Sequence, residues 1–121
     1  MELIGPRPGV RVLDVGAGTG LVAVPVAQTV GALGNVVALD IAKAMLRELT
    51  RAAAGIDNVR LILGDAEQPP FRDAAFDWVV AASVIFFLPD PAAALREWWR
   101  VLKPGGRVLS TVWGEGLDQP E

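Results

Sequence analysis

The 121-residue chain contains no cysteine, no histidine and no tyrosine. Without cysteine it can form no disulfide, no thiolate nucleophile and no zinc–thiolate site. Without histidine it lacks an imidazole base, a Ser-His-Asp triad and the usual ligand of transition metals, so no metal site is expected. Any proton transfer must therefore use Asp, Glu, Lys, water or the substrate itself.

Long apolar runs and strong charge are missing as well. Hydrophobic residues make up 52% of the chain, but Asp, Arg, Pro or Gly interrupts each apolar run within a few residues, so no membrane span is expected. Eleven basic residues against fourteen acidic ones give a net charge of −3, which offers no electrostatic footprint for nucleic acid. The opening residues 1–8 lack the basic head and apolar body of a signal peptide, which predicts a cytoplasmic protein.

A glycine-rich stretch, VLDVGAGTG at positions 12–20, is the most informative feature. Apolar residues up to Val15 predict a buried strand and a helical pattern begins at Thr19, so the glycines form a turn between strand and helix. Glycines let a ligand lie against the backbone, and free N–H groups at a helix start favour an anionic group. Dinucleotide sites use G-x-G-x-x-G, but Leu21 stands in place of the third glycine, and the spacing over 14–20 is D-x-G-x-G-x-G. The pattern predicts a ligand site; a glycine-rich connection without a ligand is the alternative.

Apolar strands alternate with amphipathic helices along the chain. Strands are predicted at 10–15, 35–40, 58–63, 76–82 and 107–113, and helices at 19–29, 42–53 and 91–102. The strands are continuous apolar runs, which predicts a parallel sheet covered on both faces in a doubly wound α/β domain. Pro25 is expected to kink the first helix, and Lys103–Gly106 to form a turn before the last strand.

Helical spacing also predicts which side chains of the later helices are buried. For the second helix these are Ala42, Met45, Leu46, Leu49, Ala52 and Ala53. For the third helix, which Asp90 should cap with Pro91 at its first position, they are Ala92, Leu95, Trp98, Trp99 and Leu102.

Three acidic residues stand at or near the carboxyl ends of successive strands. Asp40 lies where nucleoside sites place a carboxylate that accepts both ribose hydroxyls; the alternative is a cap for the second helix. Asp65 could accept from an adenine amino group while the N–H of Ala66 reaches a ring nitrogen; the alternative is a turn-forming Asx residue. Asp14 could hold the glycine turn by accepting backbone N–H bonds, or lie near the charged end of the ligand.

Together these residues resemble the cofactor-binding half of class I S-adenosylmethionine (SAM)-dependent methyltransferases. DVGAGTG at 14–20 matches the glycine motif of that family, VALD at 37–40 the ribose-binding strand end, and GDAEQPPF at 64–71 the adenine-binding segment. The block from Ala93 to Arg107 resembles the group that includes ubiquinone and menaquinone biosynthesis methyltransferases. The resemblance implies a Rossmann-like doubly wound parallel sheet of about five strands in the order 3-2-1-4-5.

The resemblance also implies the function and its site. The SAM site would comprise Asp14, Gly16, Ala17, Gly18, Gly20, Asp40, Ile41, Asp65, Ala66 and Ser83. The implied reaction is methyl transfer to a small-molecule acceptor, which leaves S-adenosylhomocysteine; no residue stands out as a catalytic base. One alternative is a SAM-binding module or an inactive truncated paralogue that acts through a partner chain. Another is an NAD-binding oxidoreductase, which Leu21 and the lack of a Tyr or His acid disfavour.

The chain departs from the family pattern at both ends. Helices ahead of the glycine motif and two strands after the fifth are usual in the family, and residues 1–121 include neither. We therefore expect a minimal or truncated SAM-binding domain over 1–113, lacking the usual last two strands, with a flexible tail at 114–121. The fifth strand would then be an exposed apolar edge, which predicts a homodimer formed through it.

Overall fold

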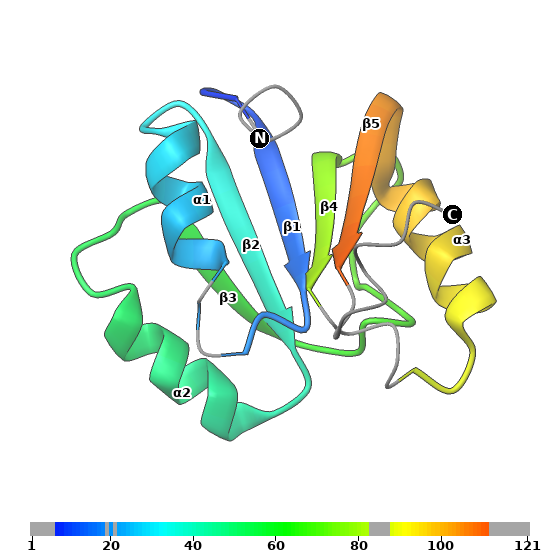
Figure 1. The fold of residues 1–121 in the computed structure, drawn as a ribbon, viewed down its shortest axis with the longest axis horizontal. Coiled ribbons are helices and arrows are strands. Elements are labelled where there is room, and N and C mark those ends of the chain that lie inside the picture. The colour runs from blue at the N-terminus through cyan, green and yellow to red at the C-terminus, as the bar shows by residue number, and fades with distance from the viewer. Residues whose placement is uncertain (1–6, 19, 21, 83–87, 112–121) are drawn as a thin grey trace.

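A computed structural model describes residues 7–18, 20, 22–82 and 88–111 of the chain (Figure 1). The described residues form, in chain order, β1 (Arg11–Val15), α1 (Ala23–Val30), β2 (Asn35–Asp40), α2 (Lys43–Ala52), β3 (Val59–Leu63), β4 (Phe76–Ala82), α3 (Pro91–Val101) and β5 (Leu102–Thr111). The five strands are all parallel and lie in the order β3-β2-β1-β4-β5, which confirms the predicted Rossmann-like sheet.

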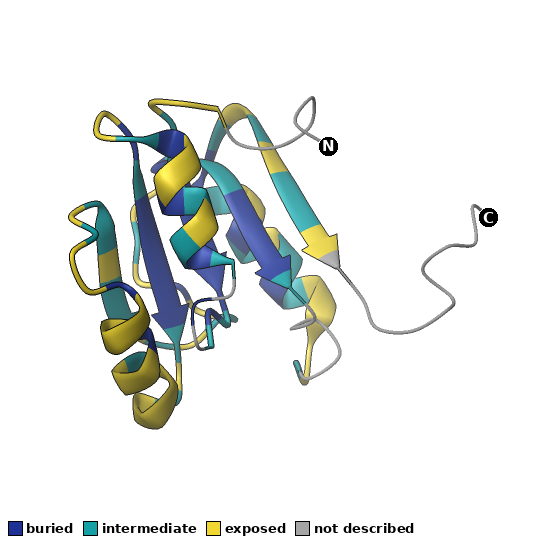
Figure 2. Cartoon of the chain, turned by 60° about the vertical axis from the view of Figure 1, so that its left-hand side comes forward, coloured by how far each residue is buried: buried dark blue, intermediate teal, exposed yellow. Residues whose placement is uncertain are grey.

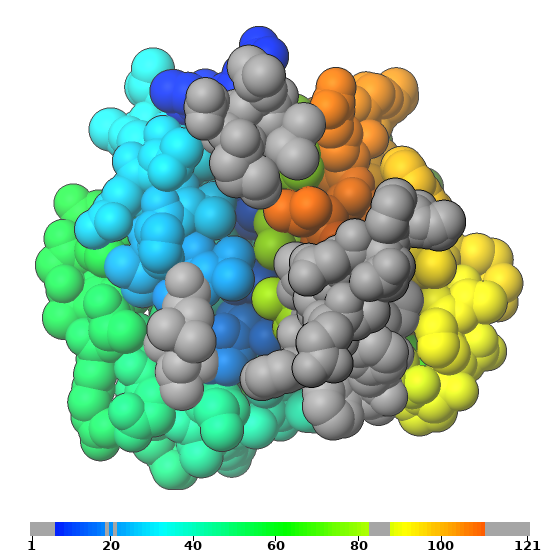
Figure 3. Space-filling view, viewed as in Figure 1, coloured from blue at the N-terminus to red at the C-terminus, as the bar shows by residue number. Residues whose placement is uncertain are grey.

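The helices cover the two faces of the sheet separately. Helices α1 and α2 lie over one face, where Val12 of β1 and Val36 of β2 pack with Leu49 of α2. In Figure 3 the atoms of these two helices occupy part of the left-hand side of the surface. Helix α3 lies over the other face, where Leu13 of β1 packs in one core with Trp98. Neighbouring residues of one strand thus enter opposite cores, as the alternation of side chains along a strand requires.

The first helix differs from its prediction. It begins at Ala23 rather than Thr19, because the glycine turn continues to Gly20, whose φ is +94°. Pro25 is therefore the third residue of α1 and stands in its first turn, where a backbone N–H has no partner within the helix. Pro25 therefore removes no hydrogen bond from within the helix, which was the reason for predicting a kink there. The helix ends at Val30, one residue later than predicted, and Gly31 (φ +71°) is its C-terminal cap.

The buried side of α2 is narrower than predicted, and within α3 only Trp98 of the predicted residues is buried. Of the residues predicted to be buried in the second helix, only Leu49 in α2 and Ala53 directly after it are buried, and Met45 is 41% exposed. Figure 2 shows that most of this helix is exposed beside the edge of the sheet. In α3 the buried residues are Ala94, Trp98 and Val101, whereas Trp99 is 56% exposed. Adjacent helical residues point about 100° apart, so only one of two neighbouring tryptophans can face the sheet.

The fifth strand starts five residues earlier than expected. Leu102 pairs with Phe76 and Arg107 with Trp78, so residues 103–106 bulge out opposite the single residue Asp77. The predicted turn is this bulge, with Gly105 at φ +83°. The predicted end of the strand at 112–113 and the predicted tail at 114–121 lie outside the described residues. None of the helices in the described part of the chain combines the length and apolar character that a membrane crossing requires.

Candidate functional site

Asp40 joins the two chain segments that leave β1 and β2 at the same edge of the sheet. Its Oδ2 accepts a hydrogen bond of 2.8 Å from the backbone N–H of Gly18, and its Oδ1 accepts one of 2.9 Å from the N–H of Ala42. The N–H of Ala17 donates to the carbonyl of Leu39 at 3.0 Å, which holds the glycine turn against the end of β2. The half-buried carboxylate therefore already organises the glycine turn and the entry to α2.

The glycines of the turn serve different physical purposes. Gly16 (φ +68°) and Gly18 (φ +59°) adopt a left-handed conformation that other residues rarely take. Among the described residues, a Cβ on Gly18 would meet no atom closer than 4.0 Å, so this part of the chain leaves the space beside it open to a ligand. A Cβ on Gly20 would instead lie 2.4 Å from Cδ1 of Leu49, so this glycine lets the start of α1 approach α2. The structure thus shows a packing contact at Gly20, which was predicted as a ligand residue.

Asp14 is the buried acid of the site. It is 2% exposed, and its Oδ2 has no hydrogen-bond partner among the described residues. Burial, and to a smaller extent the charge of Asp40, raises the pKa of Asp14 from 3.8 to about 7. A carboxyl at this depth, with Oδ2 unpartnered among the described residues, is costly when charged, so near neutral pH it carries a proton for much of the time.

The segment after β3 returns to the same edge. The N–H of Gly64 donates to the carbonyl of Asp40 at 3.0 Å. Asp65 is exposed, and its Oδ1 accepts from the N–H of Glu67 at 2.8 Å, which is the turn geometry of an Asx residue. The carbonyl of Ala66 accepts a hydrogen bond of 2.8 Å from Nε1 of Trp98. Hydrogen bonds therefore connect Gly18, Asp40 and Gly64 into one continuous rim.

The sequence that forms this rim matches a family of known proteins. Residues 13–110 match the family described as a methyltransferase domain. The chain belongs to this methyltransferase family. It is 42% identical over 110 residues to nocamycin O-methyltransferase of Saccharothrix syringae, covering 89% of this chain and 39% of that protein. It is 39% identical over 109 residues to demethylmenaquinone methyltransferase of Staphylococcus aureus, covering 90% of this chain and 45% of that protein.

A solved structure shares the fold of this methyltransferase domain. The crystal structure of a SAM-dependent methyltransferase from Aquifex aeolicus superimposes with a TM-score of 0.88 at 28% identity, covering 99% of this chain and 65% of that one. The family predicted from the glycine motif is confirmed. The chain spans less than half the length of the two curated relatives, with 39% and 45% of them covered.

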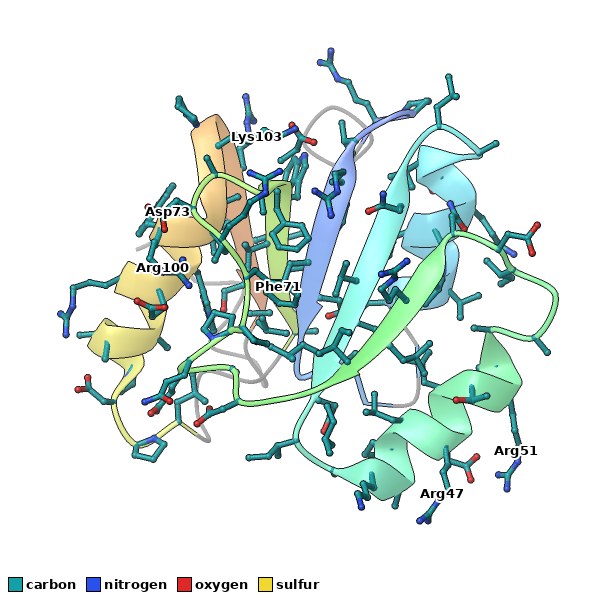
Figure 4. All side chains as sticks on the ribbon, turned by 180° about the vertical axis from the view of Figure 1, so that it is seen from behind. Arg47, Arg51, Phe71, Asp73, Arg100 and Lys103 are labelled. Atoms are coloured by element: carbon teal, nitrogen blue, oxygen red, sulfur yellow. The ribbon has the colours of Figure 1, made fainter. Side chains whose placement is uncertain are left out.

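Two residues for which the sequence predicted no site role hold the segment after β3, which continues this rim, in place. Trp98 reaches it through the bond to Ala66, although the sequence indicated only an apolar core residue. Arg100 donates from Nη1 to the carbonyl of Phe71 at 2.8 Å, from Nη2 to that of Pro69 at 3.2 Å, and pairs with Asp73 at 2.9 Å (Figure 4). Its only signal in the sequence was Glu97, three residues earlier, with which it also pairs at 2.9 Å.

Three predicted site residues remain, Ala17, Ile41 and Ser83. Ala17 is buried in the core beneath the glycine turn. Ile41 is 73% exposed directly after Asp40, and Leu63 at the end of β3 is 48% exposed, so apolar surface accompanies the polar rim. Ser83 lies outside the described residues. Within the described part of the chain, no three or more acidic side chains lie close enough together to hold a metal ion.

Proposed function

We propose that the chain is the cofactor-binding part of a methyltransferase that uses SAM to methylate a small-molecule acceptor. The observation that carries the proposal is Asp40, placed at the end of β2 with both carboxylate oxygens directed to the glycine turn and to the start of α2. The names of the relatives, an O-methyltransferase and a menaquinone-type methyltransferase, support a small organic acceptor.

Asp40 can hold a ribose without giving up its present bonds. Each carboxylate oxygen accepts about two hydrogen bonds, and each receives one from the described part of the chain, which leaves one further acceptor position on each oxygen there. Two ribose hydroxyls match this pair of positions. The exposed face of Ile41, next along the chain, would cover an apolar part of the nucleoside.

The other assignments follow the rim. Gly16 and Gly18 would pass along the methionine part of SAM, where the open space beside Gly18 admits it. Asp65 and the N–H of Ala66 would bind the adenine, Asp14 would lie beneath the turn, and Ser83 would face the acceptor.

Methyl transfer from SAM requires few chemical groups from the protein. A nucleophilic O, N or C atom of the acceptor forms a bond to the methyl carbon while the carbon–sulfur bond breaks, and its electron pair stays on sulfur to give S-adenosylhomocysteine. Because the sulfonium is already an activated donor, the domain would contribute chiefly proximity and alignment. An acceptor that is ionised in solution needs no base from the protein, and none is assigned.

Equilibrium binding tests the proposal. Calorimetric titration should show that SAM binds and NAD does not. Gly18→Val should abolish SAM binding because its side chain fills ligand space, whereas Gly55→Val should not. Gly55 is the matched control, since it also has a positive φ (+80°) with no atom within 4 Å of an added Cβ. Failure of the parent chain to bind SAM would overturn the proposal, whereas normal SAM binding by folded Gly18→Val would remove Gly18 from the site. SAM binding without methyl transfer to any phenol or quinol would favour a binding module.

The homodimer is part of this proposal. Among the described residues β5 pairs with β4 alone, and its outer edge offers unpaired backbone groups to a second copy. Light scattering over a dilution series should show a dimer that weakens in Ser110→Lys, which adds a charge to an exposed position of this edge. A monomer at every concentration would contradict it. The cytoplasmic location also stays a prediction.

A further inference from the structure

The face of the sheet that carries α3 has a groove beyond this helix. Helix α3 packs beside β4 and β5, and seen from behind in Figure 4 no described helix crosses β1, β2 and β3. The groove has a volume of about 650 Å³, which lies within the range of small-molecule sites. The side chains that matter most in its lining are Arg11, Asn35, Val37, Arg60, Ile62 and Phe71.

The groove is separate from the proposed cofactor site. Arg11 and Asn35 are the first residues of β1 and β2, and Arg60 is the second residue of β3. They therefore lie toward the amino ends of the strands, whereas Gly18 and Asp40 lie at the carboxyl ends. What the groove binds does not depend on the function proposed above.

Arg11 is held in place as a rigid donor. Its Nε donates to Oδ1 of Asn35 at 3.3 Å and its Nη1 to the carbonyl of Ala75 at 3.0 Å, while the guanidinium lies 5.2 Å from the ring centroid of Phe76. A guanidinium has five N–H donors, so these two bonds fix its plane, and its other donors have no partner among the described residues. The Arg11 side chain would therefore lose little conformational entropy when these donors bind an acidic group.

A second guanidinium comes from the neighbouring strands. Arg60 of β3 stands in register with Val37 of β2, is exposed, and forms no hydrogen bond or ion pair with any described residue. Asp57 is the one carboxylate in the groove lining, so two positive charges face a single negative one. Arginine forks match the geometry of carboxylate, sulfonate and phosphate oxygens.

The rest of the groove is apolar. Val37 is buried, and Ile62 and Phe71 are half-buried against the same core. These side chains offer a surface for a hydrocarbon or aromatic body next to the charged groups. A ligand that fits both parts carries one acidic group on an apolar framework.

We propose that this groove binds a small organic anion, an aromatic or aliphatic body bearing one carboxylate, sulfonate or phosphate group, with Arg11 and Arg60 as its charged partners. The site lies on the opposite side of the sheet from α1 and α2 and is separate from the proposed cofactor site. The chain should therefore be able to bind SAM and the anion at the same time.

Anilinonaphthalene sulfonate is a suitable probe, since its fluorescence reports transfer of an aromatic sulfonate into an apolar site. We expect saturable binding of one probe per chain that is roughly ten- to a hundredfold weaker in Arg60→Gln, because a charge-assisted hydrogen bond is lost. Arg47→Gln is the matched control, an exposed arginine on α2 that faces away from the groove (Figure 4). It should bind the probe as the parent does. The neutral analogue phenylnaphthylamine should bind at least about tenfold more weakly than the sulfonate.

Several results would overturn the proposal. They are the absence of saturable binding, an equal loss in Arg47→Gln and Arg60→Gln, and equal binding of the neutral analogue. Displacement of the probe by saturating SAM would also overturn it, because the probe would then occupy the cofactor site. Since Arg60 is exposed, its variant should keep the parent circular dichroism spectrum. Amide NMR shifts on probe addition should centre on Val37 and Ile62. These outcomes leave the proposed methyltransferase function untouched.

Discussion

Oδ2 of Asp40 accepts a hydrogen bond of 2.8 Å from the backbone N–H of Gly18, which lies 22 residues earlier in the sequence. The contact exists because β1 and β2 are parallel neighbours, with Val15 in register with Leu39, so their carboxyl ends meet. The residue proposed to bind ribose thus also shapes the turn that the methionine part would follow. Changing Asp40 should therefore affect both the cofactor and the loop.

Asp40→Ala should weaken SAM binding roughly ten- to a hundredfold, because charge-assisted hydrogen bonds are lost. It should also lower the free energy of unfolding without ligand by about 1–3 kcal/mol, because the N–H groups of Gly18 and Ala42 lose their acceptor. Asp40→Asn should be milder in both respects, since its carbonyl keeps one acceptor. Calorimetric titration and urea unfolding measure the two effects. Asp57→Ala, an exposed acid of the loop before β3, is the control, and unchanged SAM affinity in Asp40→Ala would remove Asp40 from the site.

The buried carboxyl of Asp14 predicts that stability falls as the pH rises. Its pKa is raised to about 7 in the folded chain and is 3.8 when unperturbed, so the folded state holds a proton that the unfolded state has released. This contribution to stability is complete below the unperturbed pKa and is lost as the pH rises through the folded pKa. A pKa difference of this size corresponds to on the order of 4 kcal/mol.

Asp14→Asn tests this dependence, because its amide cannot ionise. Between about pH 5 and about pH 8 the parent should lose stability relative to the variant, with most of the change below the folded pKa of Asp14. Urea unfolding at a series of pH values measures the difference. Asp57→Asn, at an exposed position, should follow the parent. Parallel curves for the parent and Asp14→Asn would show that Asp14 is ionised in the folded chain.

Local signals in the sequence were enough for much of the fold. The bounds predicted for β2 (35–40) and β4 (76–82) are those of the structure, since apolar β-rich runs are flanked there by turn residues. The start of α3 was also predicted, because Asp90 accepts from the N–H of Ala93 at 3.1 Å with Pro91 at the first helical position. A cap depends only on neighbouring residues, which a sequence displays directly.

Features that depend on distant segments could not be predicted this way. Trp98 and Trp99 are equivalent in sequence, and only the position of α3 on the sheet decides which one is buried. The candidate site shows the same limit. The sequence placed Asp14, Asp40 and Asp65 at or near strand ends, but it did not reveal that Asp40 already binds the glycine turn, and it left the Asx turn of Asp65 as one of two alternatives.

Gly20 is predicted to matter for packing, which separates it from Gly18. Gly20→Ala should destabilise the chain by about 1–3 kcal/mol, because the new Cβ would lie 2.4 Å from Cδ1 of Leu49. Gly31→Ala shares a positive φ (+71°) but meets no atom within 4 Å, so it should cost less and show the backbone strain alone. In urea unfolding, the loss in Gly20→Ala combined with Leu49→Ala should be smaller than the sum of the single losses, because truncation of Leu49 frees the space. Strict additivity would mean that the contact with Leu49 is not the cause.

The neighbouring tryptophans of α3 allow a matched test of how the rim is held. Trp98→Phe removes the donor to the carbonyl of Ala66 and leaves a smaller side chain in the core, so it should lower the free energy of unfolding by about 1–3 kcal/mol. Trp99→Phe changes a side chain that is 56% exposed and should stay within about 0.5 kcal/mol of the parent.

Affinity for SAM separates a role at the rim from a role in the core alone. If the bond from Trp98 positions Ala66 for the adenine, Trp98→Phe should weaken SAM binding roughly tenfold at a temperature where the variant is fully folded. Trp99→Phe should bind as the parent does. A Trp98→Phe variant that is less stable yet binds SAM with parental affinity would restrict Trp98 to the core, because the segment after β3 would then reach its bound position without that hydrogen bond.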